Sequence, residues 1–177
     1  HSVRDSAVLL DATAGPLPGR ADEFDGSAGS FADALVRDMP ELRVALWTDG
    51  LAGEAVSEEC VRATTGAARL CESVGCQVEE VRPPVEGGAL RDALDVVFTT
   101  NIRQVVQAVL ADQPAAVAGG LLEPITVACF EAGARHDGAA YEAALRHARR
   151  VAHAMEEFFE RFDLLLTPTL AEPPMAL

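Results

Sequence analysis

Lysine and long apolar runs are both absent from this 177-residue sequence. All 14 of its basic residues are arginines, and no apolar stretch approaches the ~20 residues that a membrane-spanning helix needs. A signal peptide is lacking too, because the chain opens on a polar, helix-forming segment. An opening without an initiator methionine is typical of a fragment or a processed chain. These absences argue against a membrane partner and predict a cytoplasmic protein.

The cysteines lack the spacing of a metal site. They stand at Cys60, Cys71, Cys76 and Cys129, form no CxxC motif, and have no histidine at a zinc-site distance along the chain. We therefore expect buried free thiols in a reducing cytoplasm, and no metal.

The charge balance narrows the range of partners. The formal net charge is −14, so an acidic surface disfavours nucleic acid and anionic membranes. The hydrophobic fraction of 49% excludes a disordered chain, and 177 residues suffice to bury one core.

Hydrophobic periodicity predicts strands that alternate with helices. A helix over Ser2–Ala14 is followed by a long surface connection, Leu17–Pro40. The strand Leu42–Trp47, a helix capped by Ser57 and the strand Cys76–Val81 then form a βαβ unit, which requires parallel strands. The later elements are predicted to be helices Gly88–Ala111 and Leu121–Arg135, a helix capped by Asp137, and the strand Leu164–Leu166.

The last of these strands contains no polar residue. Because Leu164–Leu166 shows no polar–apolar alternation, we expect both of its faces to be buried, as in a central parallel strand. The sequence thus predicts an α/β fold with a mostly parallel sheet and helices on both faces.

Asn101 is the first candidate for substrate binding. It falls on the apolar stripe predicted for the Gly88–Ala111 helix, which comprises Leu90, Leu94, Phe98, Val105 and Val109. A polar side chain there must be hydrogen-bonded internally or line a wet or ligand-filled cavity. A satisfied core amide is the favoured alternative, and Thr99 is a weaker candidate on an adjacent face.

Thr167 and Thr169 are the second pair of candidates. They lie where a predicted parallel strand ends, and ligands of open α/β sheets gather at the carboxyl ends of strands. The alternative, which the sequence leaves equally open, is that both threonines organise the turn at Pro168.

Both ends of the chain resemble the amidase signature family. The segment Glu157–Pro174, EFFERFDLLLTPTLAEPP, resembles the family's closing helix, aromatic–Asp pair, apolar strand, TPT motif and proline-rich tail. The opening His1–Gly15, HSVRDSAVLLDATAG, resembles a family helix that lies downstream of the catalytic serines. The sequence also resembles one branch of the family, the 6-aminohexanoate-cyclic-dimer hydrolase-like bacterial amidases. One of the matching motifs is LEP at Leu122–Pro124.

The resemblance implies a catalytic machinery that this chain does not contain. Members of the family use a nucleophilic serine, a bridging serine on a cis peptide and a lysine base, within a Gly/Ser-rich signature. This chain has no lysine, and no Gly/Ser-rich run holds its serines, which are Ser2, Ser6, Ser27, Ser30, Ser57 and Ser73. We therefore expect no catalytic residue here and read residues 1–177 as the C-terminal part of a larger amidase-like α/β/α domain.

The implied parent enzyme cleaves C–N amide bonds through an acyl-enzyme and needs no cofactor. Its expected partners are the N-terminal region of the same protein and a small-molecule amide substrate, and a homodimer is compatible with the sequence. The alternative is a stand-alone, non-catalytic α/β module that binds a partner through an exposed sheet edge. The absence of the triad is compatible with either hypothesis.

Overall fold

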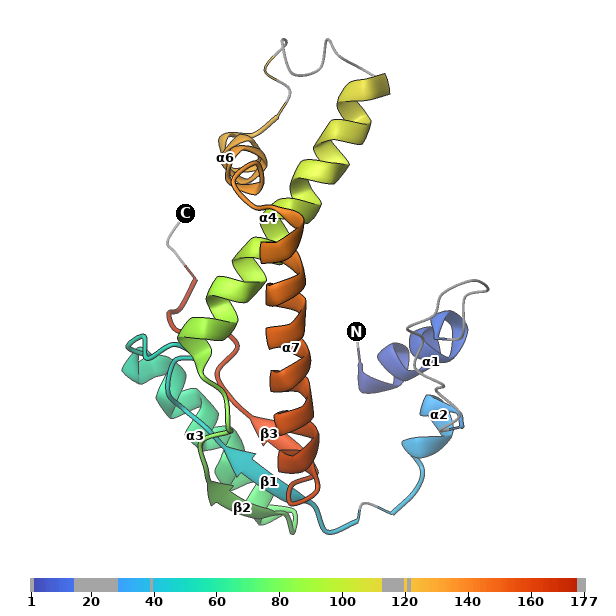
Figure 1. Ribbon diagram of the computed structural model, residues 1–177. Coiled ribbons are helices and arrows are strands. Elements are labelled where there is room, and N and C mark those ends of the chain that lie inside the picture. Colours follow the sequence, from blue (N-terminus) through green and yellow to red (C-terminus); the bar gives the residue numbers. More distant parts are fainter. Residues whose placement is uncertain (1, 15–28, 39, 113–119, 121, 175–177) are drawn as a thin grey trace. The chain divides into compact units, whose positions relative to one another are not determined.

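The computed structural model describes residues 2–14, 29–38, 40–112, 120 and 122–174. They belong to two compact units, His1–Pro40 and Glu41–Leu177. Helices α1 and α2 lie in the first unit, and every other labelled element lies in the second (Figure 1).

The first unit opens on a capped helix. Helix α1, Val3–Thr13, begins after Ser2, whose hydroxyl accepts a hydrogen bond from the Asp5 N–H at 3.2 Å. The Asp5 carboxylate accepts one in return from the Ser2 N–H at 2.8 Å. This reciprocal capping box satisfies two N–H groups at the helix start and confirms the predicted first helix.

Asp11 of α1 holds the start of a short helix, α2, Phe31–Ala34. Its carboxylate accepts hydrogen bonds from the N–H groups of Ala32 at 3.1 Å and Phe31 at 2.6 Å and from the Ser30 hydroxyl at 2.8 Å. These bonds, that from Ala32 first, hold the pKa of Asp11 below its ordinary value. The predicted connection Leu17–Pro40 thus contains a helix, while residues 15–28 and 39 lie outside the described residues.

The second unit is built on a parallel sheet. Strands β1, Arg43–Leu46, β2, Gln77–Glu80, and β3, Leu164–Leu166, lie in the order β2-β1-β3, and both neighbours run parallel to β1. The predicted βαβ unit and parallel sheet are therefore confirmed. The expectation that β3 is central is wrong for the described residues, because β1 takes the central place and Leu164 at the edge is 49% exposed.

Helices cover both faces of the sheet. Helix α3, Glu58–Ser73, leads from β1 to β2, and α7, Gly138–Phe159, leads into β3 on the other side of β1. Right-handed crossovers that step in opposite directions place their helices on opposite faces (Figure 1). Val44 and Ala45, which point to opposite faces of β1, are accordingly 2% and 0% exposed. The predicted α/β class is confirmed.

The core of the sheet layer lies under the end of α7. Ala45 packs with Phe158 and Phe162, and Met155 and Leu165 lie against this cluster. The rings of Phe158 and Phe162 are 4.9 Å apart between centroids, a distance at which aromatic pairs attract.

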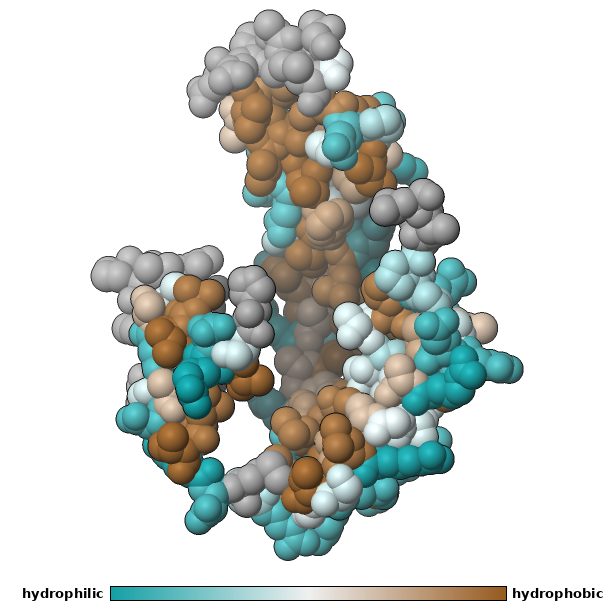
Figure 2. Space-filling view, turned by 180° about the vertical axis from the view of Figure 1, so that it is seen from behind, coloured by the Kyte–Doolittle hydropathy of each residue, from teal (hydrophilic) through white to brown (hydrophobic). Residues whose placement is uncertain are grey.

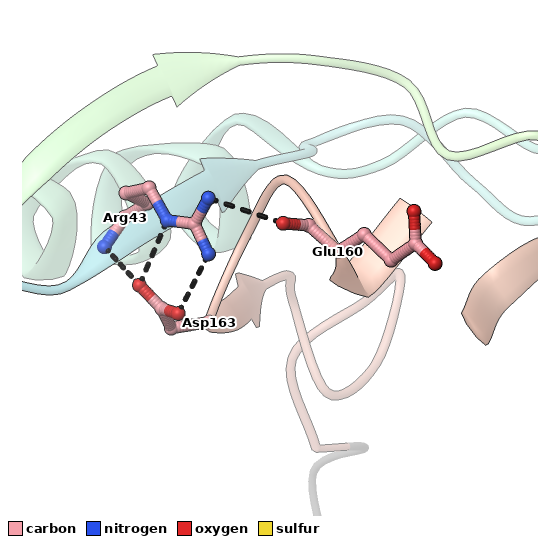
Figure 3. A network of polar contacts seen from close by, with 3 residues as sticks. All are labelled: Arg43, Glu160 and Asp163. Atoms are coloured by element: carbon pink, nitrogen blue, oxygen red, sulfur yellow. Dashed lines mark hydrogen bonds and ion pairs between the residues drawn. The ribbon is translucent and has the colours of Figure 1, made fainter. Parts of the chain in front are cut away.

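An ion pair fastens the N-terminal end of β1 to the start of β3, beside the end of α7 (Figure 3). The Asp163 carboxylate accepts hydrogen bonds from the Arg43 guanidinium at 2.9 and 3.2 Å and from the Arg43 N–H at 2.8 Å. The same guanidinium donates to the Glu160 carbonyl at 3.2 Å. These bonds, with the Arg43 side chain first, lower the pKa of Asp163 to about 2.

Long helices form the rest of the second unit. Helix α4, Gly87–Asp112, packs against α6, Pro124–Gly133, and against α7 (Figure 1). A Cβ built on Gly133 would lie 2.3 Å from the Thr99 carbonyl oxygen, so glycine is what allows α4 and α6 to approach this closely. Across the same contact the Arg103 guanidinium lies 4.6 Å above the Phe130 ring.

The apolar stripe predicted for α4 does not face the described core. Leu94, Phe98, Val105 and Val109 are between 46% and 61% exposed, whereas the buried residues of this helix include Ala93, Thr99 and Val106. The expectation of a buried stripe is therefore wrong for the described residues, because α6 and α7 cover a different, smaller-residue face. Figure 2 shows the resulting hydrophobic surface over the C-terminal half of α4.

Candidate functional site

The candidate site lies at the carboxyl ends of β1 and β3. Trp47 follows β1 directly and Thr167 follows β3 directly. The register pairs Leu46 with Leu166, and the Trp47 N–H donates to the Leu166 carbonyl at 2.9 Å. The sheet therefore brings two segments far apart in sequence, residues 48–56 and 167–171, to the same edge.

A cavity of about 390 Å³ lies between these two segments. We call it the tryptophan cavity. Its lining consists of Trp47, Asp49, Gly50, Leu51, Glu54, Val56 and residues 167–171. Its size is in the range of small-molecule sites, ~300–1,000 Å³.

A second cavity, of about 370 Å³, lies on the other side of the same threonines. We call it the proline cavity. Cys60, Thr64 and other residues of α3 form one wall, and residues 166–170 and 172–174 form the other. Residues 167–170, which include Thr167 and Thr169, line both cavities, so this segment separates them.

The loop of residues 48–56, which lines the tryptophan cavity, is held against α4. The Glu54 carboxylate accepts hydrogen bonds from the Ala52 N–H at 2.8 Å and from the Arg91 guanidinium at 3.0 Å. Bonds from the backbone N–H groups of Glu54 itself and of Ala52, and then the charge of Arg91, lower the pKa of Glu54. A Cβ on Gly87 would lie only 1.6 Å from the Leu51 carbonyl oxygen, so the loop rests directly on the start of α4.

Asn101 lies elsewhere, on the exposed face of α4. Its side-chain oxygen accepts a hydrogen bond from the Tyr141 hydroxyl of α7 at 3.3 Å. It also lines an open hollow of about 540 Å³, together with Arg91, Leu94, Asp95, Val97 and Phe98. Asn101 thus has an internal hydrogen bond and borders a hollow, so the two interpretations of this residue are not separated.

Thr99 is buried at the contact between α4 and α6. It is 3% exposed, and its hydroxyl donates to the Asp95 carbonyl at 2.7 Å. Thr99 lines none of the cavities described above. The structure therefore brings Thr167 and Thr169 together but places Thr99 and Asn101 on another element, and substrate binding by all four stays a prediction.

The sequence reasoning missed Trp47 as a site residue. Trp47 is the single tryptophan of the chain, and it follows a buried strand at the edge where ligands of such sheets gather. That position was the available signal. The sequence contains no signal for the Glu54–Arg91 pair, because nothing in the spacing of these two residues predicts their contact.

No cluster that could hold a metal ion occurs among the described residues. The four cysteines are free and half-buried rather than fully buried. None of the described helices has both the length and the apolar character needed to cross a membrane.

Comparison with solved structures identifies the fold. The chain is similar to a bacterial aryl acylamidase of the amidase signature family, with a TM-score of 0.81 at 23% identity over 98% of this chain and 36% of that one. It is also similar to 6-aminohexanoate cyclic dimer hydrolase, with a TM-score of 0.71 at 24% identity over 91% of this chain and 34% of the other. The fold is that of the amidase-signature enzymes.

Sequence comparison identifies the family. The profile of the family described as Amidase matches residues 1–177, and the chain belongs to this family. It is 30% identical to the 6-aminohexanoate-cyclic-dimer hydrolase of Paenarthrobacter ureafaciens over 96% of this chain and 35% of the relative. It is 28% identical to a glutamyl-tRNA(Gln) amidotransferase subunit of Thermus thermophilus over 98% of this chain and 40% of the relative. The chain thus spans 35% to 40% of the length of these relatives.

Proposed function

We propose that this chain is the C-terminal segment of a cytoplasmic amidase that cleaves non-peptide C–N amide bonds through an acyl-enzyme. The observation that carries the proposal is the family match over residues 1–177. The serine pair and the lysine base would belong to an upstream region, because this chain contains no lysine. No cofactor is required for this chemistry.

The proposed contribution of the chain is to complete the core and to shape the substrate pocket. Thr167 and Thr169 would offer hydroxyls to the substrate from the carboxyl edge of the sheet, where they border two cavities. Asn101 and Thr99 would act from α4. The partners in this proposal are the upstream region, a small-molecule amide and a second copy of the protein in a homodimer.

The experiment compares the 177-residue chain with the same chain preceded by its encoded upstream region. Both are assayed with a simple aryl amide such as a nitroanilide. We expect no turnover by the chain alone and measurable turnover with the upstream region, lost when the upstream lysine is replaced by alanine.

Two outcomes would contradict the proposal. Turnover by the chain alone that survives replacement of its six serines would point to another mechanism. A gene whose start codon lies near His1, with no upstream Gly/Ser-rich segment, would favour a stand-alone binding module.

A further inference from the structure

Trp47 has a buried donor without an acceptor. The side chain is 7% exposed, and its indole nitrogen has no hydrogen-bond partner among the described residues. An indole N–H can only donate, and a buried donor left unpaired destabilises the fold. Such a group calls for an explanation, and Trp47 borders the tryptophan cavity.

The walls of that cavity are joined to each other at both ends. At one end the Trp47 N–H donates to the Leu166 carbonyl at 2.9 Å. At the other end the Ser57 N–H donates to the Ala171 carbonyl at 2.8 Å. With the loop also held on α4 through Glu54 and Gly87, the cavity is a built feature of the fold rather than a gap between loose segments.

The two carboxylates that line the cavity, Glu54 and Asp49, differ in their hydrogen bonds and ion pairs. Glu54 is occupied by the Ala52 N–H and by Arg91. Asp49 is exposed and has no hydrogen bond or ion pair to any described residue. The cavity therefore presents one free negative charge, which repels an anion and tolerates a neutral or cationic ligand.

We propose that the tryptophan cavity binds the carbonyl oxygen of a small uncharged or cationic amide, with the Trp47 indole N–H as the donor and Asp49 disfavouring carboxylates. This inference rests on the proposed amidase function and deepens it. Hydrolysis of an amide turns a neutral carbonyl compound into a carboxylate and an amine. A site that accepts the amide but repels the carboxylate favours substrate entry and acid release.

The single tryptophan allows a direct test. In the ¹⁵N-labelled 177-residue chain one indole N–H resonance reports on Trp47, and it is followed during titration with hexanamide and with hexanoate. The nitrogen is covered in this structure, so binding has to move the indole or the wall in front of it. We expect the indole resonance to shift with hexanamide and the shift to saturate. Hexanoate should bind about fivefold more weakly, because a fivefold ratio corresponds to the repulsion between two like charges ~4 Å apart in water.

Two variants, with Asp92→Asn as a control, separate the contributions of Asp49 and Trp47. Asp49→Asn should remove the preference for hexanamide, whereas Asp92→Asn, on α4 and outside the cavity lining, should keep it. Trp47→Phe should weaken hexanamide binding about fivefold in ligand-observed NMR, as expected for one lost hydrogen bond.

An indole signal that hexanamide does not shift would overturn the inference, because the donor would then serve only the fold or an internal water. Equal binding of hexanoate would overturn the role of Asp49. These binding results do not depend on turnover. If the complete enzyme is active but the indole resonance of the 177-residue chain does not shift, the proposed function stands and the proposed binding site is wrong.

Discussion

Arg43 and Asp163, 120 positions apart, are joined by three hydrogen bonds that align the start of β1 with the start of β3. The aspartate belongs to the Phe–Asp pair through which the sequence resembles the amidase signature family. Its carboxylate accepts hydrogen bonds from both the backbone and the side chain of Arg43, so this aspartate helps to fix the register of the two strands.

The first prediction concerns the pH dependence of stability. The folded-state pKa of Asp163 is about 2, below its ordinary value of 3.8, because the carboxylate accepts the Arg43 bonds. A depressed folded pKa means that the stabilisation is complete above pH ~4 and is lost as pH falls toward 2. Urea unfolding between pH 2 and 6 should show this loss, and Asp163→Asn should flatten the curve while Asp92→Asn leaves it unchanged. A curve that Asp163→Asn does not alter would show that the pair is energetically silent.

The second prediction concerns the contact of α4 and α6. Gly133→Ala places a Cβ 2.3 Å from the Thr99 carbonyl oxygen, which is backbone and cannot move aside alone. We expect a loss of about 1–3 kcal/mol in the free energy of unfolding. Gly66→Ala in α3 is the matched control, because its Cβ meets nothing within 4 Å, and it should stabilise by up to ~1 kcal/mol. Equal effects of the two substitutions would contradict the tight helix contact.

The third prediction separates the two interpretations of Asn101. If it forms part of the substrate wall, Asn101→Leu in the complete enzyme should change kcat/KM or substrate preference while costing less than about 1 kcal/mol of stability. Tyr141→Phe removes the same 3.3 Å hydrogen bond but leaves the amide in place, so it controls for structural loss. Normal kinetics with a large loss of stability in Asn101→Leu would assign the residue to the helix contact.

The fourth prediction concerns the exposed side of α4. Phe98 and Val105 are 58% and 61% exposed, so the isolated chain should bind a hydrophobic dye and form soluble oligomers. The double substitution Phe98→Glu and Val105→Glu should reduce both signals in dye fluorescence and light scattering. Leu70→Glu, on α3 and also exposed, should reduce them less. A monomeric chain with a sharp, cooperative melt would instead indicate a self-sufficient domain.

Local signals carried most of the sequence-based prediction of the fold. Ser57 and Asp137 were recognisable caps, and both accept the expected backbone hydrogen bonds, from Cys60 and Ala140. The βαβ order determined parallel pairing without reference to any long-range contact.

The sequence misled where burial depends on what covers an element. The large apolar residues of α4 indicated its core face, yet the buried residues of this helix are smaller ones, and glycine at 133 allows α6 to approach them closely. Similarly, the apolar character of Leu164–Leu166 does not determine whether this strand lies at the centre or at the edge of the sheet. The tryptophan cavity was out of reach for the same reason, since it depends on the juxtaposition of residues 48–56 with 167–171.

The strand order also has a consequence for synthesis on the ribosome. β2 can pair with β1 once residue 80 has been made, but β3 becomes available only after residue 166. During the intervening elongation the second edge of β1 stays open, and open strand edges are templates for wrong pairing. The nascent chain therefore has an interval in which a chaperone that shields open strand edges would be most useful, and this interval closes when Asp163 reaches Arg43.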